Sequence, residues 1–206
     1  MQKRFQGHLE VPLSEHGIEQ ARAVGVWLAR QPVRFAAVYS SDLVRAMQTA
    51  QEIAERLRLE VYPAPALREL YCGEWQGLSV DEVNRLYPGK LQEWHDRVEQ
   101  FALPQGESIP TLQARTHAYF KEVTRRHVGE AIIMVSHGAA LSALLIAVQG
   151  LSLAEAWHAR KTRMGNTGVT ALLFDPVNGD AVILAHNSTE HLAEPTGMSS
   201  VLDTVV

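Results

Sequence analysis

The stretch Ala131-Ile-Ile-Met-Val-Ser-His137-Gly138 decides the fold, because a short apolar run leads directly into a histidine, a glycine and an apolar helical sequence that begins near Ala139. In open α/β sheets, ligands bind at the carboxyl ends of the strands, and His137 lies at such an end. Backbone N–H groups and the helix dipole favour an anion there. We therefore expect a phosphate beside His137, although a histidine in a strand-to-helix turn is also often a simple capping residue.

Strands and helices alternate on both sides of this stretch. Strands are predicted at Phe35–Ser40, Val169–Phe174 and Ala181–His186, and apolar residues at helical spacing predict helices that begin near Glu15 and Leu43, lie near Val80–Leu86 and Leu91–Val98, and pass through Leu112 and Val123. This alternation predicts a three-layer α/β/α sandwich with a mixed, mostly parallel sheet. Residues 1–193 should form one domain, with 194–206 as a loose tail.

Composition narrows the class of protein. The 206 residues are 46% hydrophobic, which suffices for one domain with a substantial core. A net charge of −4 argues against nucleic acid as the main partner. The single cysteine, Cys72, fits a reducing compartment, so the cytoplasm is expected, and no apolar run approaches the length of a membrane span. The sequence does not decide between a monomer and a homodimer.

Three further features point to phosphate chemistry. Arg45 falls in the first turn of a predicted helix, where its charge opposes the dipole; Asp42 could pair with it, or it could bind a phosphate with both guanidinium nitrogens. Glu69 lies between apolar neighbours that could raise its pKa toward that of a general acid, although it could equally be solvated. Gln6 and Gly7 form a predicted tight turn that could face a ligand or be an ordinary polar turn.

Taken together, these motifs resemble the histidine phosphatase superfamily, also called the phosphoglycerate mutase-like family, over nearly the whole chain. The similar segments are 4–14 with Gly17, Gln20 and Ala21; 39–46 with Thr49 and Ala50; 67–70 with Gly73, Trp75 and Gly77; and 106–108, 135–138 and 166–170.

The resemblance implies roles for these residues. Arg45 would hold the transferring phosphoryl group with Gly138 nearby, His137 would stabilise it, and Glu69 would donate and accept the proton. Gln6 and Gly7 would line the substrate side. Positioned cations and hydrogen-bond donors do most of the work in phosphoryl transfer, so neither a metal nor another cofactor is expected.

The sequence departs from the family at one decisive point. The family's first strand ends in Arg-His-Gly, whose histidine is the covalent nucleophile, and this motif should lie upstream of Arg4. The only Arg-His pair, Arg126-His127, closes a helical pattern and is not followed by glycine. The histidines at positions 8, 95, 117, 158, 186 and 191 share no metal-ligand spacing and are interpreted as surface or packing residues. We expect the true start to lie further upstream, or the chain to be shortened.

The predicted function is a phosphomonoester phosphatase with a phosphohistidine intermediate, acting on a phosphorylated small molecule. The alternatives are a phosphoglycerate mutase and a catalytically inactive phosphate-binding domain. Mutases of this family carry a longer middle insertion with more basic residues, whereas residues 78–105 contain only Arg85, Lys90 and Arg97 as cations. The aromatic residues Tyr71, Trp75, Tyr87 and Trp94 could shape a leaving-group pocket or simply pack.

Overall fold

A computed structural model describes residues 4–193 of the chain, and the predicted loose tail lies outside the described residues. The helices are α1 (Glu15–Ala29), α2 (Val44–Leu57), α3 (Val80–Leu86), α4 (Lys90–Asp96), α5 (Ile109–Arg126), α6 (Gly138–Val148) and α7 (Leu153–His158). The strands are β1 (Phe35–Ser40), β2 (Val61–Pro63), β3 (Ala131–Val135), β4 (Val169–Phe174) and β5 (Ala181–Ser188), and short 3₁₀ turns lie at Pro65–Leu67, Gly73–Trp75 and Glu190–Leu192.

Local sequence explains where the helices begin. Ser14 accepts a hydrogen bond from the Gly17 N–H at the start of α1, and Ser108 does the same for Thr111 at the start of α5. Ser79 and Glu82 form a reciprocal capping box at α3. These side chains satisfy N–H groups that have no partner within the helix.

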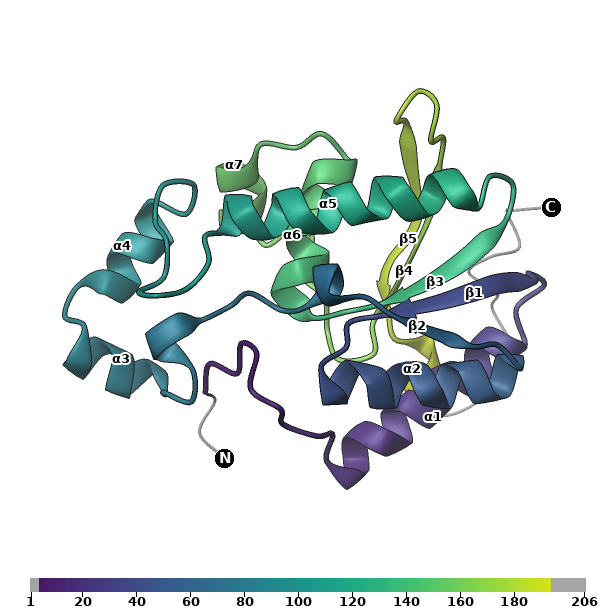
Figure 1. Ribbon diagram of the computed structural model, residues 1–206, viewed down its shortest axis with the longest axis horizontal. Helices are drawn as coiled ribbons and strands as arrows, with labels where there is room; N and C mark the ends of the chain where they lie inside the picture. Colours follow the sequence, from purple (N-terminus) through teal and green to yellow (C-terminus); the bar gives the residue numbers. More distant parts are fainter. Residues whose placement is uncertain (1–3, 194–206) are drawn as a thin grey trace.

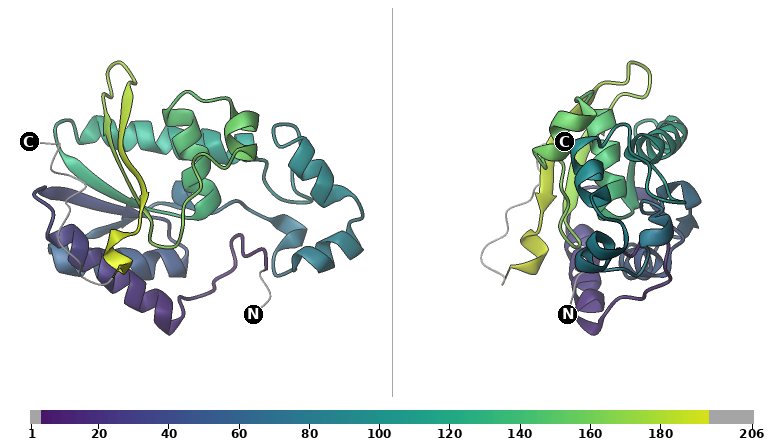
Figure 2. Two further views of the ribbon diagram at one scale, coloured as in Figure 1. Left: turned by 180° about the vertical axis from the view of Figure 1, so that it is seen from behind. Right: turned by 90° about the vertical axis from the view of Figure 1, so that its left-hand side faces the viewer.

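The strands form two hydrogen-bonded sheets. The first is parallel with the order β2-β1-β3, and the second is the antiparallel pair β4-β5. The sequence predicted one mixed sheet, and the difference lies at β3: among residues 4–193, the strand β1 pairs with one edge of β3 and no strand pairs with the other. Figure 2 shows the β4-β5 hairpin at one side of the molecule.

Helices cover both faces of the parallel sheet, as Figure 1 shows. On one face, α1 and α2 bury Val24 and Ile53 against Val38 of β1. On the other, Val123 of α5 packs with Ala37 of β1. These clusters give the three layers that the hydrophobic pattern predicted, and burial of their apolar surface holds the layers together.

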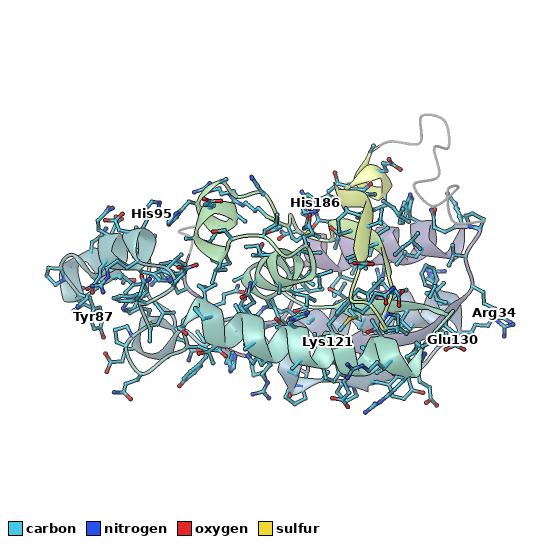
Figure 3. The ribbon with its side chains drawn as sticks, turned by 90° about the horizontal axis from the view of Figure 1, so that it is seen from above. Arg34, Tyr87, His95, Lys121, Glu130 and His186 are labelled. Carbon is cyan, nitrogen blue, oxygen red and sulfur yellow. The ribbon has the colours of Figure 1, made fainter. Side chains whose placement is uncertain are left out.

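Residues 70–108, which we call the cover, contain α3 and α4 and pack against α5 and α6 around the fully buried Trp75. The cover faces the carboxyl ends of the strands. Arg34 and Glu130, which precede β1 and β3, lie at one end of the molecule in Figure 3, and Tyr87 and His95 of the cover lie at the other.

Most predicted elements are confirmed, with ends that agree within a few residues. The helix α7 was missed. It spans only Leu153–His158, which is too short for an apolar repeat to stand out.

Candidate active site

The candidate site lies where β1 and β3 end side by side. Ser40-Ser41 follows β1 and Ser136-His137 follows β3, and the Ser41 N–H donates to the carbonyl of Val135 at 2.9 Å. Since parallel strands end at the same edge of a sheet, this bond sets Ser41 and His137 next to each other.

His137 is buried, with 8% of its surface exposed, and it caps the N-terminus of α6. Its Nε2 atom lies 2.8 Å from Ser41 Oγ. Burial lowers the pKa of His137 to about 3, and the positive charge of Arg45 acts in the same direction. The ring is therefore neutral at neutral pH. Because Ser41 Oγ accepts from the Leu43 N–H, the serine hydrogen is free to point at Nε2. With the serine hydrogen on Nε2, Nδ1 would be the ring's N–H donor.

Glu69 occupies the N-terminus of α6. One carboxylate oxygen accepts from the Ala140 N–H at 3.1 Å and the other from the Ala139 N–H at 3.2 Å. In the structure, these two N–H groups, which the sequence suggested for a phosphate, are occupied by the protein's own carboxylate. The predicted effect of burial holds: it raises the pKa of Glu69 even though three backbone N–H groups oppose the shift.

Arg45 is half-buried, and its guanidinium donates to the carbonyls of Gly7 at 2.8 Å and Leu9 at 3.0 Å. The predicted alternative partner, Asp42, instead forms a two-point ion pair with Arg68 at 2.7 and 2.6 Å. The pairing of Arg45 with Asp42 is therefore wrong. Arg45 lies close enough to Glu69 and His137 for their charges to influence one another.

The turn at Gln6-Gly7 forms as predicted. Gly7 has a φ of +53°, and a Cβ atom there would lie 2.5 Å from the Gln76 side-chain oxygen, so only glycine suits this position. Gln6 is exposed, and so is Gly138, beside which a Cβ atom would meet nothing within 4 Å. Whether these three residues contact a ligand stays a prediction.

Two residues that sequence reasoning missed hold Glu69 in place. Arg115 of α5 donates to the carbonyls of Ala66, Arg68 and Glu69 at 2.8 to 2.9 Å, and it forms a two-point ion pair with Glu107. Neither residue belongs to a short motif with Glu69, since 46 positions separate Glu69 from Arg115.

His8, interpreted from sequence as a surface or packing residue, belongs to the site. Its Nε2 atom lies 2.8 Å from the carbonyl oxygen of Glu69, and its backbone N–H donates to Gln76. Its position directly after the Gln6-Gly7 turn was the available signal. His127, by contrast, contacts Tyr39 and Glu130 far from the site.

The aromatic residues of the cover divide by role. Trp75 is fully buried, and the partly buried Trp94 packs against the same core cluster. Tyr87 donates its hydroxyl to Glu74. Only Tyr71 of the four lines the pocket described below. The cations Lys90 and Arg97 both pair with Glu93 on the cover.

Two properties of residues 4–193 bear on cofactors and membranes. No group of three or more histidine, cysteine, aspartate or glutamate side chains there could hold a metal ion. None of the helices in the same range is long and apolar enough to cross a membrane.

Comparison with known proteins defines the family. The model of the histidine phosphatase superfamily (branch 1) matches residues 1–188. The chain is 32% identical to phosphoserine phosphatase 1 of Hydrogenobacter thermophilus over 191 residues, covering 93% of this chain and 87% of that protein. It is 31% identical to the probable phosphoglycerate mutase GpmB of Yersinia pestis over 197 residues, covering 94% and 89%.

A solved structure agrees with these relatives. The mycobacterial glucosyl-3-phosphoglycerate phosphatase in complex with inorganic phosphate superposes with a TM-score of 0.79 at 29% identity, covering 94% of this chain and 95% of that one. The chain belongs to the histidine phosphatase superfamily, whose members similar to it include both phosphatases and phosphoglycerate mutases. The predicted α/β fold class is confirmed.

Proposed function

We propose that this protein is a metal-independent phosphomonoester phosphatase that acts on a phosphorylated small molecule. The observation that carries the proposal is the convergence of a half-buried arginine, a neutral buried histidine and a carboxyl group of raised pKa at one strand edge. Arg45 and the Nδ1–H of His137 would bind the equatorial phosphoryl oxygens, where negative charge is spread during transfer. Gln6, Gly7 and Gly138 would lie around the bound group.

Glu69 would act first as the acid and then as the base. The phosphorus–oxygen bond to the leaving group breaks as a nucleophile's bond to phosphorus forms, and Glu69 gives its proton to the departing oxygen. In the second step a water molecule attacks phosphorus as the bond between phosphorus and the nucleophile breaks, Glu69 takes the water's proton, and inorganic phosphate leaves. The raised pKa of Glu69 suits this exchange.

The nucleophile of the proposed phosphohistidine mechanism would be a histidine on a strand beside β3. Two hydrophobic clusters support this location. Met134 of β3 shares one with Leu172 of β4, and Ile133 of β3 shares the other with Val169, yet β3 and β4 form no ladder among the described residues. A strand between them would end next to His137, at the edge where the strand ends carry the site.

Hydrolysis of p-nitrophenyl phosphate in the presence of a chelator tests the proposal. A form that carries a strand ending in Arg-His-Gly ahead of Arg4 should turn over at least about 1,000 times faster than the 206-residue chain, because loss of a covalent nucleophile typically costs that much or more. Turnover should leave an acid-labile phosphoryl group on the enzyme. Sensitivity to the chelator, or equal rates in the two forms, would contradict it.

The acid role of Glu69 has its own signature in that form. The Glu69→Gln variant should slow alkyl phosphates strongly and p-nitrophenyl phosphate only slightly, since a nitrophenolate leaves without protonation. His137→Ala should slow both, because it removes stabilisation of the transferring group. Equal losses in Glu69→Gln for both substrates would exclude Glu69 as the acid.

A mutase is the second candidate function because a phosphoglycerate mutase is among the similar proteins. The cover argues against it, since two of its three cations between residues 78 and 105, Lys90 and Arg97, are paired with Glu93.

We place the phosphatase in the cytoplasm, where the lone buried thiol of Cys72 would stay reduced.

A further inference from the structure

A surface pocket of about 370 Å³ lies beside the proposed phosphoryl site, lined by His8, Tyr71, Glu107, Ser108 and Thr111 together with Ala102 and Gly106. His8 joins the two. It directly follows Gly7, whose carbonyl binds Arg45, and its ring contacts the carbonyl of Glu69. A substrate whose phosphoryl group lies between Arg45 and His137 therefore has this pocket next to it.

His8 lines the pocket, and its ring carries one hydrogen-bond donor and one acceptor. Its Nε2 atom faces the Glu69 carbonyl oxygen at 2.8 Å, and a carbonyl can only accept, so Nε2 carries the hydrogen. Burial lowers the pKa of His8, which keeps the ring neutral. Nδ1 is then an acceptor suited to a hydroxyl group.

The charges around the pocket are already balanced. Glu107 is held by Arg115 at 2.7 and 2.9 Å, and the remaining N–H groups of Arg115 reach backbone carbonyls. Arg68 is occupied by Asp42. Neither lysine nor arginine lines the pocket. A second anionic group on the substrate would lose its hydration there without gaining a counter-ion.

The other lining groups suit a hydroxylated carbon chain. The hydroxyls of Ser108 and Thr111 lie 2.9 Å apart at the start of α5, and each can both donate and accept. The Tyr71 ring packs beside the His8 ring with centroids 5.0 Å apart and is 40% exposed, which offers an apolar face to C–H groups.

We propose that this pocket receives an uncharged, hydroxyl-bearing leaving group, so that the substrate is the phosphomonoester of a polyol or sugar rather than a phosphorylated carboxylic acid. The proposal rests on the proposed function, because it assumes that the phosphoryl group binds at Arg45 and His137. It adds a specificity role for His8, with Glu107, Ser108 and Thr111 as further partners for substrate hydroxyls.

Calorimetric binding of two matched esters to the full chain tests this. Glycerol 3-phosphate and 3-phosphoglycerate share their skeleton and differ only by a terminal CH₂OH or carboxylate. Glycerol 3-phosphate should bind at least about fivefold more tightly, the effect of roughly one well-placed hydrogen bond. The His8→Gln variant keeps an N–H donor for the Glu69 carbonyl and moves the acceptor from the position of ring Nδ1 to the amide oxygen, so it should bring the ratio of the two affinities toward one. The exposed His16→Gln variant, on α1, should keep the native ratio.

The binding results distinguish a failure of the pocket assignment from a failure of the proposed phosphatase function. Inorganic phosphate is the reference ligand. If phosphate binds but the two esters bind equally, if 3-phosphoglycerate binds more tightly, or if His8→Gln leaves the ratio unchanged, the pocket assignment is wrong while the phosphoryl site stands. If neither phosphate nor either ester binds, the phosphoryl site itself is wrong, and this inference falls with it.

Discussion

The strands β1 and β3 make an instructive pair. Both are parallel strands that end at the site, one followed by Ser41 and the other by His137. The last four residues of β1 are buried and the strand is paired on both edges. Among residues 4–193, β3 is paired on one edge, and only its last residue, Val135, is buried. Within residues 4–193, the strands beside the site are therefore fully paired on the side of β1, whereas the far edge of β3 has no strand paired with it. That is the side on which the proposed nucleophile would stand.

The largest expected effect concerns His137, which is buried although it follows the half-paired strand. Its pKa falls from 6.5 to about 3, so the unfolded chain binds a proton that the folded chain rejects between these pH values. Stability should therefore be full above pH 6.5 and decline as pH falls toward 3, by at most about 5 kcal/mol from this residue.

Urea unfolding of His137→Asn at pH 7, 5.5 and 4 measures this contribution. The variant should lose several kcal/mol less on acidification than the native chain, because it has no imidazole to protonate. The exposed His16→Gln variant is the control. If the free energy of unfolding changes equally with pH in the native chain and in His137→Asn, the pKa of His137 is not lowered by folding, and the end of β3 does not bury the ring.

The next effect is a difference in amide hydrogen exchange between β1 and β3. Val135 directs its carbonyl toward β1, so the alternation of a strand directs the N–H groups of Ile132 and Met134 away from β1. Amide hydrogen exchange of these two groups should be at least about 100-fold faster than that of Val38 and Tyr39 in β1. Equal protection at low protein concentration would mean that something already pairs with the second edge of β3.

The smallest effect tests the contact that links the strand ends. Ser41→Ala removes the hydroxyl that orients the His137 ring, and it should weaken phosphate binding about fivefold, a loss of roughly 1 kcal/mol. Ser40→Ala is the matched control, because that hydroxyl donates to the Ser41 carbonyl and does not reach His137. If both variants bind phosphate equally well, the ring orientation does not depend on Ser41.

The fold was largely predictable because its signals are local. Strands such as Phe35–Ser40 and capped helices such as α1 follow from periodicity and from single side chains like Ser14. The division into two sheets is a long-range property of strand pairing that no short segment encodes. The short helix α7 carried too little pattern to be seen.

The site was predictable only in part, because its contacts, like strand pairing, join segments that are far apart in the sequence. Arg45, Glu69 and His137 converge as expected, but their contacts depend on distant segments. The carboxylate of Glu69 meets an N–H group 70 positions away, and Arg45 meets a carbonyl 38 positions away. Pairing from sequence neighbours therefore suggested Asp42 for Arg45, and His8 and Arg115 escaped notice.

Binding of inorganic phosphate to the full chain tests most directly whether Arg45 and His137 form a phosphoryl site at the ends of β1 and β3. The account predicts millimolar or tighter binding that raises the melting temperature, an affinity at least about 30-fold weaker in Arg45→Ala, and an intermediate affinity in Arg45→Lys, which keeps the charge and loses the planar fork. Arg34→Ala, just before β1 and so at the far end of that strand from the site, should bind like the native chain. Absence of binding, or equal affinities in Arg45→Ala and Arg34→Ala, would contradict the account.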